Sequence, residues 1–146
     1  MHFLVYAPGT PSAKASPRGI VARMHRSRLA GFIIDCQVPD LEGPAAFWSQ
    51  ALGLPRLGPE GNYVRLDGSP HDLIIEVQRV AHESRVHLDI ETDDIEAEVA
   101  RLEKLGATRV EKVRSFWVMQ APSGQRFCVV KARADLEGRG GTTTWP

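Results

Sequence analysis

The sequence predicts an α+β fold of two similar modules, each a strand followed by a helix and then several strands. The first observation is an internal repeat, because residues 31–38 (GFIIDCQV) recur as residues 85–92 (RVHLDIET). Asp35 corresponds to Asp89, 54 residues later, and the spacing is still 52 where the repeat ends. So little drift indicates one duplicated folding module. Two copies are too few for a solenoid, so we expect them to pack together and share a cleft.

The second observation is an alternation of apolar and polar residues in the first strand of each copy. Over residues 32–38, and again over residues 86–91, every second side chain is apolar. A period of two marks a strand with one buried face. The intervening positions, which would face the other side of the sheet, are Ile33, Asp35, Gln37, His87, Asp89 and Glu91.

The third observation is a helix after each of these strands. Apolar residues recur at helical spacing over residues 41–52 and 95–105, and a glycine follows each stretch at the position where helices end. Asp93 and Glu96 form a capping-box-like start for the second helix, with an acidic residue at the cap and a glutamate three residues later.

More strands follow each helix. Residues 63–67 and 115–119 are predicted as middle strands, and residues 73–78 and 126–130 as closing strands. Several strands after a single helix indicate antiparallel or mixed sheets rather than a purely parallel one.

The two ends of the chain differ from this pattern. Residues 1–30 combine prolines, glycines and basic residues without periodicity, so we expect a flexible basic extension. A mistaken start upstream of Met24 and an organelle transit peptide are the alternatives for this segment. The folded domain is predicted over residues 31–132, with modules at 31–80 and 85–132, and residues 133–146 as a loose tail.

Composition excludes several classes of protein. The chain has no apolar run near the roughly 20 residues that cross a bilayer, so no membrane partner is expected. Beyond residue 34 the chain carries 13 basic and 18 acidic side chains, which argues against nucleic-acid binding. Two cysteines cannot form a disulfide framework, so a reducing, cytoplasmic setting is expected.

The polar strand faces are the candidate site. A helix covers only one face of each sheet, which leaves the polar alternates free to line a cleft between the modules. A carboxylate within a strand is disfavoured by propensity, so the duplicated Asp35 and Asp89 are the strongest of these candidates. The plainer interpretation is that such residues are solvated strand faces. The candidates are Asp35, Gln37, Glu76, Gln78, His87, Asp89 and Glu91.

A resemblance to a known family rests on four segments. These are residues 40–54, 85–94, 98–107 and 121–130, which include Trp48 and end in APSGQRFCVV. Together they resemble the vicinal oxygen chelate superfamily of glyoxalases, bleomycin-resistance proteins and extradiol dioxygenases, in its glyoxalase-like branch. The resemblance implies two βαβββ modules that pair into a curved mixed sheet around a small-molecule cleft.

The resemblance also implies where a metal would bind. Metal-binding members take one ligand from the first strand and one from the last strand of each module, which places them here at Ile33, Glu76, His87 and Cys128. Ile33 has no donor atom, and Cys128 replaces the usual carboxylate. Glu76, His87 and Cys128 could form a three-ligand zinc or nickel site. The favoured alternative is no metal, with Cys128 as a small buried residue and His87 hydrogen-bonded to an acid.

Two functions are compatible with these residues. One is a glyoxalase-like lyase or isomerase, with His87 or Glu76 as general base near a carbonyl group of a small oxygenated substrate. The other is a metal-free protein of the bleomycin-resistance type that binds an aromatic ligand, with Tyr63 or Trp117 as a stacking surface. A homodimer is possible, because the modules could pair within one chain or exchange between two. The remaining histidines are expected to be solvated: His2, His25, His71 and His82.

Overall fold

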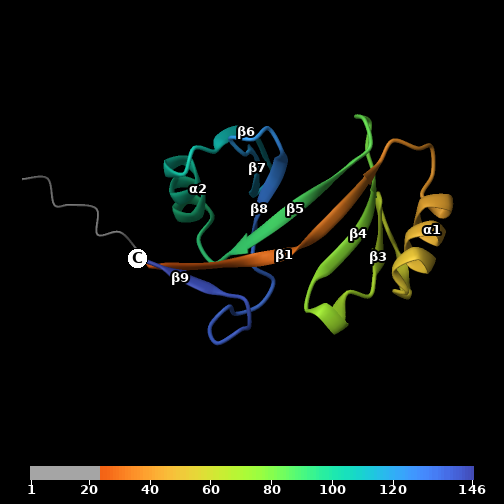
Figure 1. Cartoon of the computed structure of the whole chain (residues 1–146), viewed down its shortest axis with the longest axis horizontal. Helices are drawn as coiled ribbons and strands as arrows, with labels where there is room; N and C mark the ends of the chain where they lie inside the picture. Colours follow the sequence, from red (N-terminus) through yellow and green to blue (C-terminus); the bar gives the residue numbers. More distant parts are fainter. Residues whose placement is uncertain (1–23) are drawn as a thin grey trace, which may run out of the picture.

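The structure, a computed structural model, describes residues 24–146 as two helices on a nine-stranded mixed sheet (Figure 1). The first module comprises β1 (His25–Cys36), α1 (Glu42–Leu52), β2 (Arg56–Glu60), β3 (Tyr63–Leu66) and β4 (Ile74–Arg79). The second comprises β5 (Arg85–Thr92), α2 (Ile95–Lys104), β6 (Thr108–Val113), β7 (Phe116–Gln120) and β8 (Arg126–Lys131). A short strand, β9 (Thr143–Trp145), follows the second module.

The two modules share one continuous sheet within a single chain. The strand order is β2-β3-β4-β1-β5-β8-β7-β6, with parallel pairs β1–β4 and β5–β8. The antiparallel pair β1–β5 joins the modules and places Ile33 opposite His87. The predicted α+β class and the paired modules in a mixed sheet are therefore confirmed, and the pairing lies within the chain.

The apolar alternates of β1 pack toward α1, as predicted, whereas in β5 only Ile90 packs against the α2 cluster, and Val86 and Leu88 are exposed. In the first module, Ile34 and Cys36 belong to a core cluster against which Trp48 of α1 packs. In the second module, Val99 of α2 is fully buried in a cluster with Met119 and other strand residues. The intervening positions of β1 and β5 therefore face the side of the sheet that the helices do not cover.

The helix ends follow the predicted chemistry with one correction. Gly53 ends α1 in the left-handed conformation with a φ of 67°, where glycine has no steric cost. The cap of α2 is Asp94 rather than Asp93, because the Asp94 carboxylate accepts the Ala97 N–H at 3.0 Å. Asp93 does not cap the helix, since its carboxylate accepts the backbone N–H of Arg26 at 2.7 Å.

The ends of the domain differ from the predicted boundaries. Strand β1 begins at His25, before the predicted boundary at residue 31, and β9 pairs with it over residues 25–27. The Trp145 indole N–H donates to the Ser27 hydroxyl at 2.8 Å, and Leu136 is only 1% exposed. The tail is therefore part of the fold rather than loose. Residues 1–23 of the predicted extension lie outside the described residues.

Two buried networks of charged side chains explain why the start of β1 and the C-terminal segment belong to the fold. His25 was expected to be solvated but is buried, with its Nε2 2.7 Å from Oε2 of Glu98. Glu91 does not line the cavity as predicted, because its buried carboxylate accepts hydrogen bonds from Arg28 and Arg139 at 2.9 and 3.0 Å. These pairs connect residues 48 to 73 positions apart, so local periodicity could not reveal them.

No helix in the described part of the chain is both long and apolar enough to cross a membrane.

Candidate functional site

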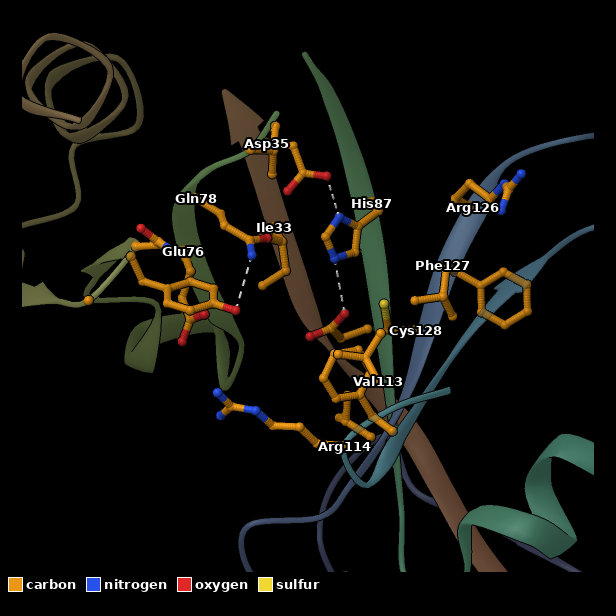
Figure 2. Close-up of a pocket in the computed structure, with 18 of the residues that line it drawn as sticks. Ile33, Asp35, Glu76, Gln78, His87, Val113, Arg114, Arg126, Phe127 and Cys128 are labelled. Atoms are coloured by element: carbon orange, nitrogen blue, oxygen red, sulfur yellow. Dashed lines mark hydrogen bonds and ion pairs between the residues drawn. The ribbon is translucent and has the colours of Figure 1, made fainter. Parts of the chain in front are cut away.

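The two modules enclose a cavity of about 940 Å³ on the side of the sheet opposite the helices (Figure 2). This volume lies within the range of small-molecule sites. Both modules contribute side chains in matching positions, since the polar alternates of β1 and β5 point inward. Strands β1, β3, β4, β5, β7 and β8 contribute lining side chains, among them Ile33, Asp35, Tyr63, Arg65, Glu76, Gln78, His87, Asp89, Phe116 and Cys128.

The duplicated aspartates face the two nitrogens of one histidine. Oδ2 of Asp35 lies 2.7 Å from Nδ1 of His87, and Oδ1 of Asp89 lies 3.4 Å from Nε2 of the same ring (Figure 2). Burial lowers the pKa of His87, but hydrogen bonds with Asp35, Asp89 and Cys128 outweigh it and raise the pKa to about 11. His87 is therefore an imidazolium cation at neutral pH.

The predicted metal ligands are only partly brought together. His87, Asp89 and Cys128 place one nitrogen, one oxygen and one sulfur within 4.8 Å of one another, whereas Glu76 does not join this group. The oxygen of this group comes from Asp89, which the sequence predicts only as a cleft-lining residue.

The residues do not fit the metal site that the resemblance implies. Ile33 offers no ligand, and Glu76 is bound by arginines. Both ring nitrogens of His87 face a carboxylate oxygen, Nδ1 at 2.7 Å and Nε2 at 3.4 Å, and the pKa of the ring is raised, so a metal would have to displace a proton from it.

Glu76 enters the cavity from β4 as a buried carboxylate with two cationic neighbours. The Arg65 guanidinium on β3 donates to Oε1 of Glu76 at 3.0 Å, and Nη2 of Arg133 lies 3.6 Å from the same oxygen. Glu76 is 7% exposed, so its orientation is fixed by these contacts. Arg65 lies opposite Glu76 in the β3–β4 register, which is why the two side chains meet.

Tyr63 places a phenol in the cavity. Its oxygen accepts the Gln78 amide N–H at 3.1 Å, which leaves the phenol proton available to a ligand. Burial, followed by the negative charges of Glu76 and Asp89, raises the pKa of the Tyr63 hydroxyl above its ordinary value. Tyr63 is therefore a hydrogen-bond donor at neutral pH.

Three expected site residues lie elsewhere. Gln37 does not line the cavity; its amide donates to the backbone oxygen of Ala81 at 2.8 Å and it stays exposed. Glu91 belongs to the buried network with Arg28 and Arg139. Trp117 does not line the cavity either, since it packs on the helix side and donates its indole N–H to Glu96 at 3.0 Å.

The basic side chains of the cavity were not singled out from the sequence. Strand alternation could have indicated two of them. Arg65 lies on the same strand face as Tyr63, two residues earlier, and Arg126 lies on the same strand face as Cys128. Only the assembled sheet shows that these faces converge. The cationic lining residues are Arg65, Arg85, Arg114, Arg126, Lys131 and Arg133.

The comparisons with known proteins agree with this architecture. The family model "Glyoxalase-like domain" matches residues 31–130. No curated protein matches the chain significantly.

Several solved structures share the fold. Methylmalonyl-CoA epimerase from Mycobacterium tuberculosis has a TM-score of 0.55 at 15% identity, over 75% of this chain and 91% of its own. The Mn(II)-bound glyoxalase from Novosphingobium aromaticivorans scores 0.51 at 21% identity, over 75% of this chain and 43% of its own. A glyoxalase/bleomycin resistance protein/dioxygenase superfamily member from Vibrio splendidus has a TM-score of 0.50 at 17% identity, over 75% of this chain and 98% of its own. Because the family model covers residues 31–130, more than half of the sequence, the chain belongs to the glyoxalase-like domain family.

Proposed function

We propose that the chain binds a small oxygenated molecule in the cavity between its modules and transfers a proton on it, as a lyase or isomerase. The observation that carries this proposal is Glu76, a carboxylate held by Arg65 against the cavity wall, close to the Tyr63 hydroxyl and the His87 cation. A base, a donor and a positive charge are the groups that a proton transfer next to a carbonyl requires.

Glu76 is the general base in this proposal. Of the two candidates from the sequence, His87 is held as a cation and has no lone pair with which to accept a proton. Glu76 carries a free second oxygen, since both arginine contacts are to Oε1. We assign proton abstraction to that oxygen.

His87 and Tyr63 stabilise the negative charge that develops on the substrate oxygen. The His87 cation contributes electrostatically, because its position is fixed by Asp35 and Asp89 before any ligand arrives. Tyr63 donates its free phenol proton as a hydrogen bond. Two structural neighbours are named as an epimerase and a glyoxalase, which supports chemistry of this kind without identifying a substrate.

A deuterium-exchange experiment tests the proton transfer. A panel of small 2-oxo acids, β-keto acids and thioesters is incubated with the protein in D₂O, and loss of the C–H proton signal is followed by NMR. We expect exchange with at least one compound, and about a hundredfold less with Glu76→Gln. Glu60→Gln is the matched control, because Glu60 lines the same cavity and makes no ion pair among the described residues. Unchanged exchange in Glu76→Gln would contradict the assignment.

A metal-free binding protein of the bleomycin-resistance type is the second candidate. The aromatic rings of Tyr63 and Phe116 line the cavity and favour it. Compounds of the panel that bind but show no exchange would point to this function. Tryptophan fluorescence would not report binding directly, since none of the three tryptophans lines the cavity.

We propose a second copy of the chain as the partner of an apolar surface on the helix side. Val86 and Leu88 of β5 point away from the cavity and are exposed, and Phe47 of α1 and Leu105 of α2 flank them. Contiguous exposed apolar side chains mark interaction surfaces. Light scattering on the intact chain should give twice the mass of one chain, and Leu88→Asp should give one. A monomer for both proteins would contradict the dimer.

The cytoplasm is the location that we propose. Both cysteines are free thiols, as expected in a reducing compartment.

A further inference from the structure

We propose that the ligand of the cavity is a small carboxylic acid, and that Arg114 and Lys131 bind its carboxylate. The inference rests on the proposed function, because it names the chemical class of the molecule that the cavity receives. The distribution and pairing of the charged side chains that line the cavity carry this inference.

Positive charge is concentrated in the cavity. The described residues carry 15 lysines and arginines against 18 acidic residues, so the body of the domain is mildly acidic. The cavity reverses this balance, because six arginines and lysines line it against four carboxylates. A cleft lined by one sign of charge raises the local concentration of ligands of the opposite sign.

Two of the four carboxylates in the cavity are paired with arginines. Oδ2 of Asp35 lies 3.7 Å from Nε of Arg85, and Oε1 of Glu76 lies 3.0 Å from Nη2 of Arg65. Asp89 and Glu60 form no ion pair with an arginine or lysine among the described residues. An incoming anion would therefore meet little repulsion from Asp35 and Glu76, although they lie within the same cavity.

Three of the cations lack a partner. Within residues 24–146, no carboxylate oxygen lies within 4 Å of a charged nitrogen of Arg114, Arg126 or Lys131, although all three line the cavity. By contrast, Arg65, Arg85 and Arg133 all lie near an acid of the cavity. The unpaired cations leave the cavity with a surplus of positive charge that a ligand anion can neutralise.

Arg114 is the best placed of the three. It sits in the tight turn between β6 and β7, where its backbone has a φ of 54°, an uncommon value for a residue other than glycine. Figure 2 shows its side chain extending from the second module toward Glu76 of the first. A guanidinium presents paired N–H donors that match the two oxygens of a carboxylate. An acid bound there would lie between the modules, beside the proposed base.

Matched ligand pairs test this inference on the intact chain. Benzoate and benzamide, pyruvate and pyruvamide, and phenyl phosphate are titrated while Kd is measured by NMR. We expect each acid to bind at least about tenfold more tightly than its amide, since a charge-assisted hydrogen bond is lost. We also expect phenyl phosphate to bind more weakly than benzoate. Amides that bind as tightly as the acids, or a preference for the phosphate, would overturn the proposal.

Variants locate the carboxylate. Arg114→Gln and Lys131→Gln should each weaken acid binding about tenfold and leave amide binding unchanged, and Arg114→Lys should retain part of the affinity. Lys104→Gln is the matched control, because Lys104 ends α2 outside the cavity. Acid binding unaffected by both glutamine variants would refute the assignment. If acids bind as expected but show no deuterium exchange, the proposed proton transfer fails while this inference stands.

Discussion

Asp35 on β1 holds Nδ1 of His87 on β5 with a contact of 2.7 Å, which joins the first strands of the two modules inside the cavity. Asp89, the residue that corresponds to Asp35 in the second module, faces the other ring nitrogen. Ile33 occupies the position in the first module that His87 occupies in the second. Duplication thus supplied two carboxylates, and divergence left one histidine between them.

The Asp35–His87 pair should contribute strongly to stability. Asp35 is 2% exposed, so Asp35→Asn leaves the His87 charge poorly compensated and should lower the free energy of unfolding by about 3–5 kcal/mol. Asp89→Asn should cost less, because that contact is longer, at 3.4 Å, and the Asp89 side chain is 20% exposed. Chemical denaturation of both variants measures the difference. Equal losses would show that the two aspartates are equivalent.

The charge of His87 gives stability a defined pH dependence. Its pKa is about 11 in the folded state and 6.5 in the unfolded chain, so the stabilisation is fully present below pH 6.5 and is lost as the pH rises toward 11. The stability difference between the wild type and His87→Gln should therefore shrink steadily above pH 7. A difference that grows with pH would mean that His87 is neutral in the folded protein.

Glu98 should control unfolding in acid. It is completely buried; burial raises its pKa, but hydrogen bonds from Arg101 and His25 outweigh this and lower the pKa below its ordinary value. Its contribution to stability is present above pH 4.5 and is lost as the pH falls below that value. Melting temperatures from pH 3 to 7 should fall less steeply in acid for Glu98→Gln than for the wild type. Parallel curves would contradict this role.

The C-terminal segment should be necessary for stability. Leu136 is 1% exposed, so Leu136→Ala should lower the free energy of unfolding by about 2–5 kcal/mol. Leu57→Ala is the matched control, because Leu57 is 51% exposed and should change stability by less than about 0.5 kcal/mol. A negligible effect of Leu136→Ala would mean that residues 133–146 are the loose tail that the sequence predicted.

A metal should not be required for ligand binding. His87 is held protonated between two carboxylates, so Zn²⁺ or Ni²⁺ would have to displace a proton of raised pKa. We expect isothermal titration at pH 7 to show no stoichiometric uptake of either ion, and chelation to leave carboxylate affinity unchanged. Tight binding of one ion per chain that His87→Ala abolishes would overturn this expectation.

The fold could be predicted because its signals are local and repeated. The alternation in β1 and β5 and the glycine after each helix depend on neighbouring residues, and the duplication shows each of them twice. The side of the sheet that Asp35, His87 and Asp89 face also followed from alternation alone. The hydrogen-bond partners of these residues could not be predicted from alternation, because the contact between Asp35 and His87 depends on how the two modules pair.

Pairing across long distances also explains the errors. Nothing near His25 or Glu91 in the sequence indicates a buried partner, and each pairs with a residue at least 48 positions away. Arg114 was overlooked for the same reason. From the sequence alone, an arginine in a hairpin turn is predicted to be solvated, and only the position of the other module shows that it lines a cavity. Gln37 alternates in phase with Asp35 but lies one residue beyond the end of β1, where its amide donates to the backbone oxygen of Ala81.

The most direct test of the central claim is an NMR map of where a small acid binds. With methyl-labelled protein and benzoate, the resonances of Ile33 and Val118 inside the cavity should shift, together with the His87 ring. The methyl groups of Val86 and Leu88 on the opposite face should not. Shifts confined to Val86 and Leu88 would place the ligand on the helix side and contradict the claim that the cavity between the modules is the functional site.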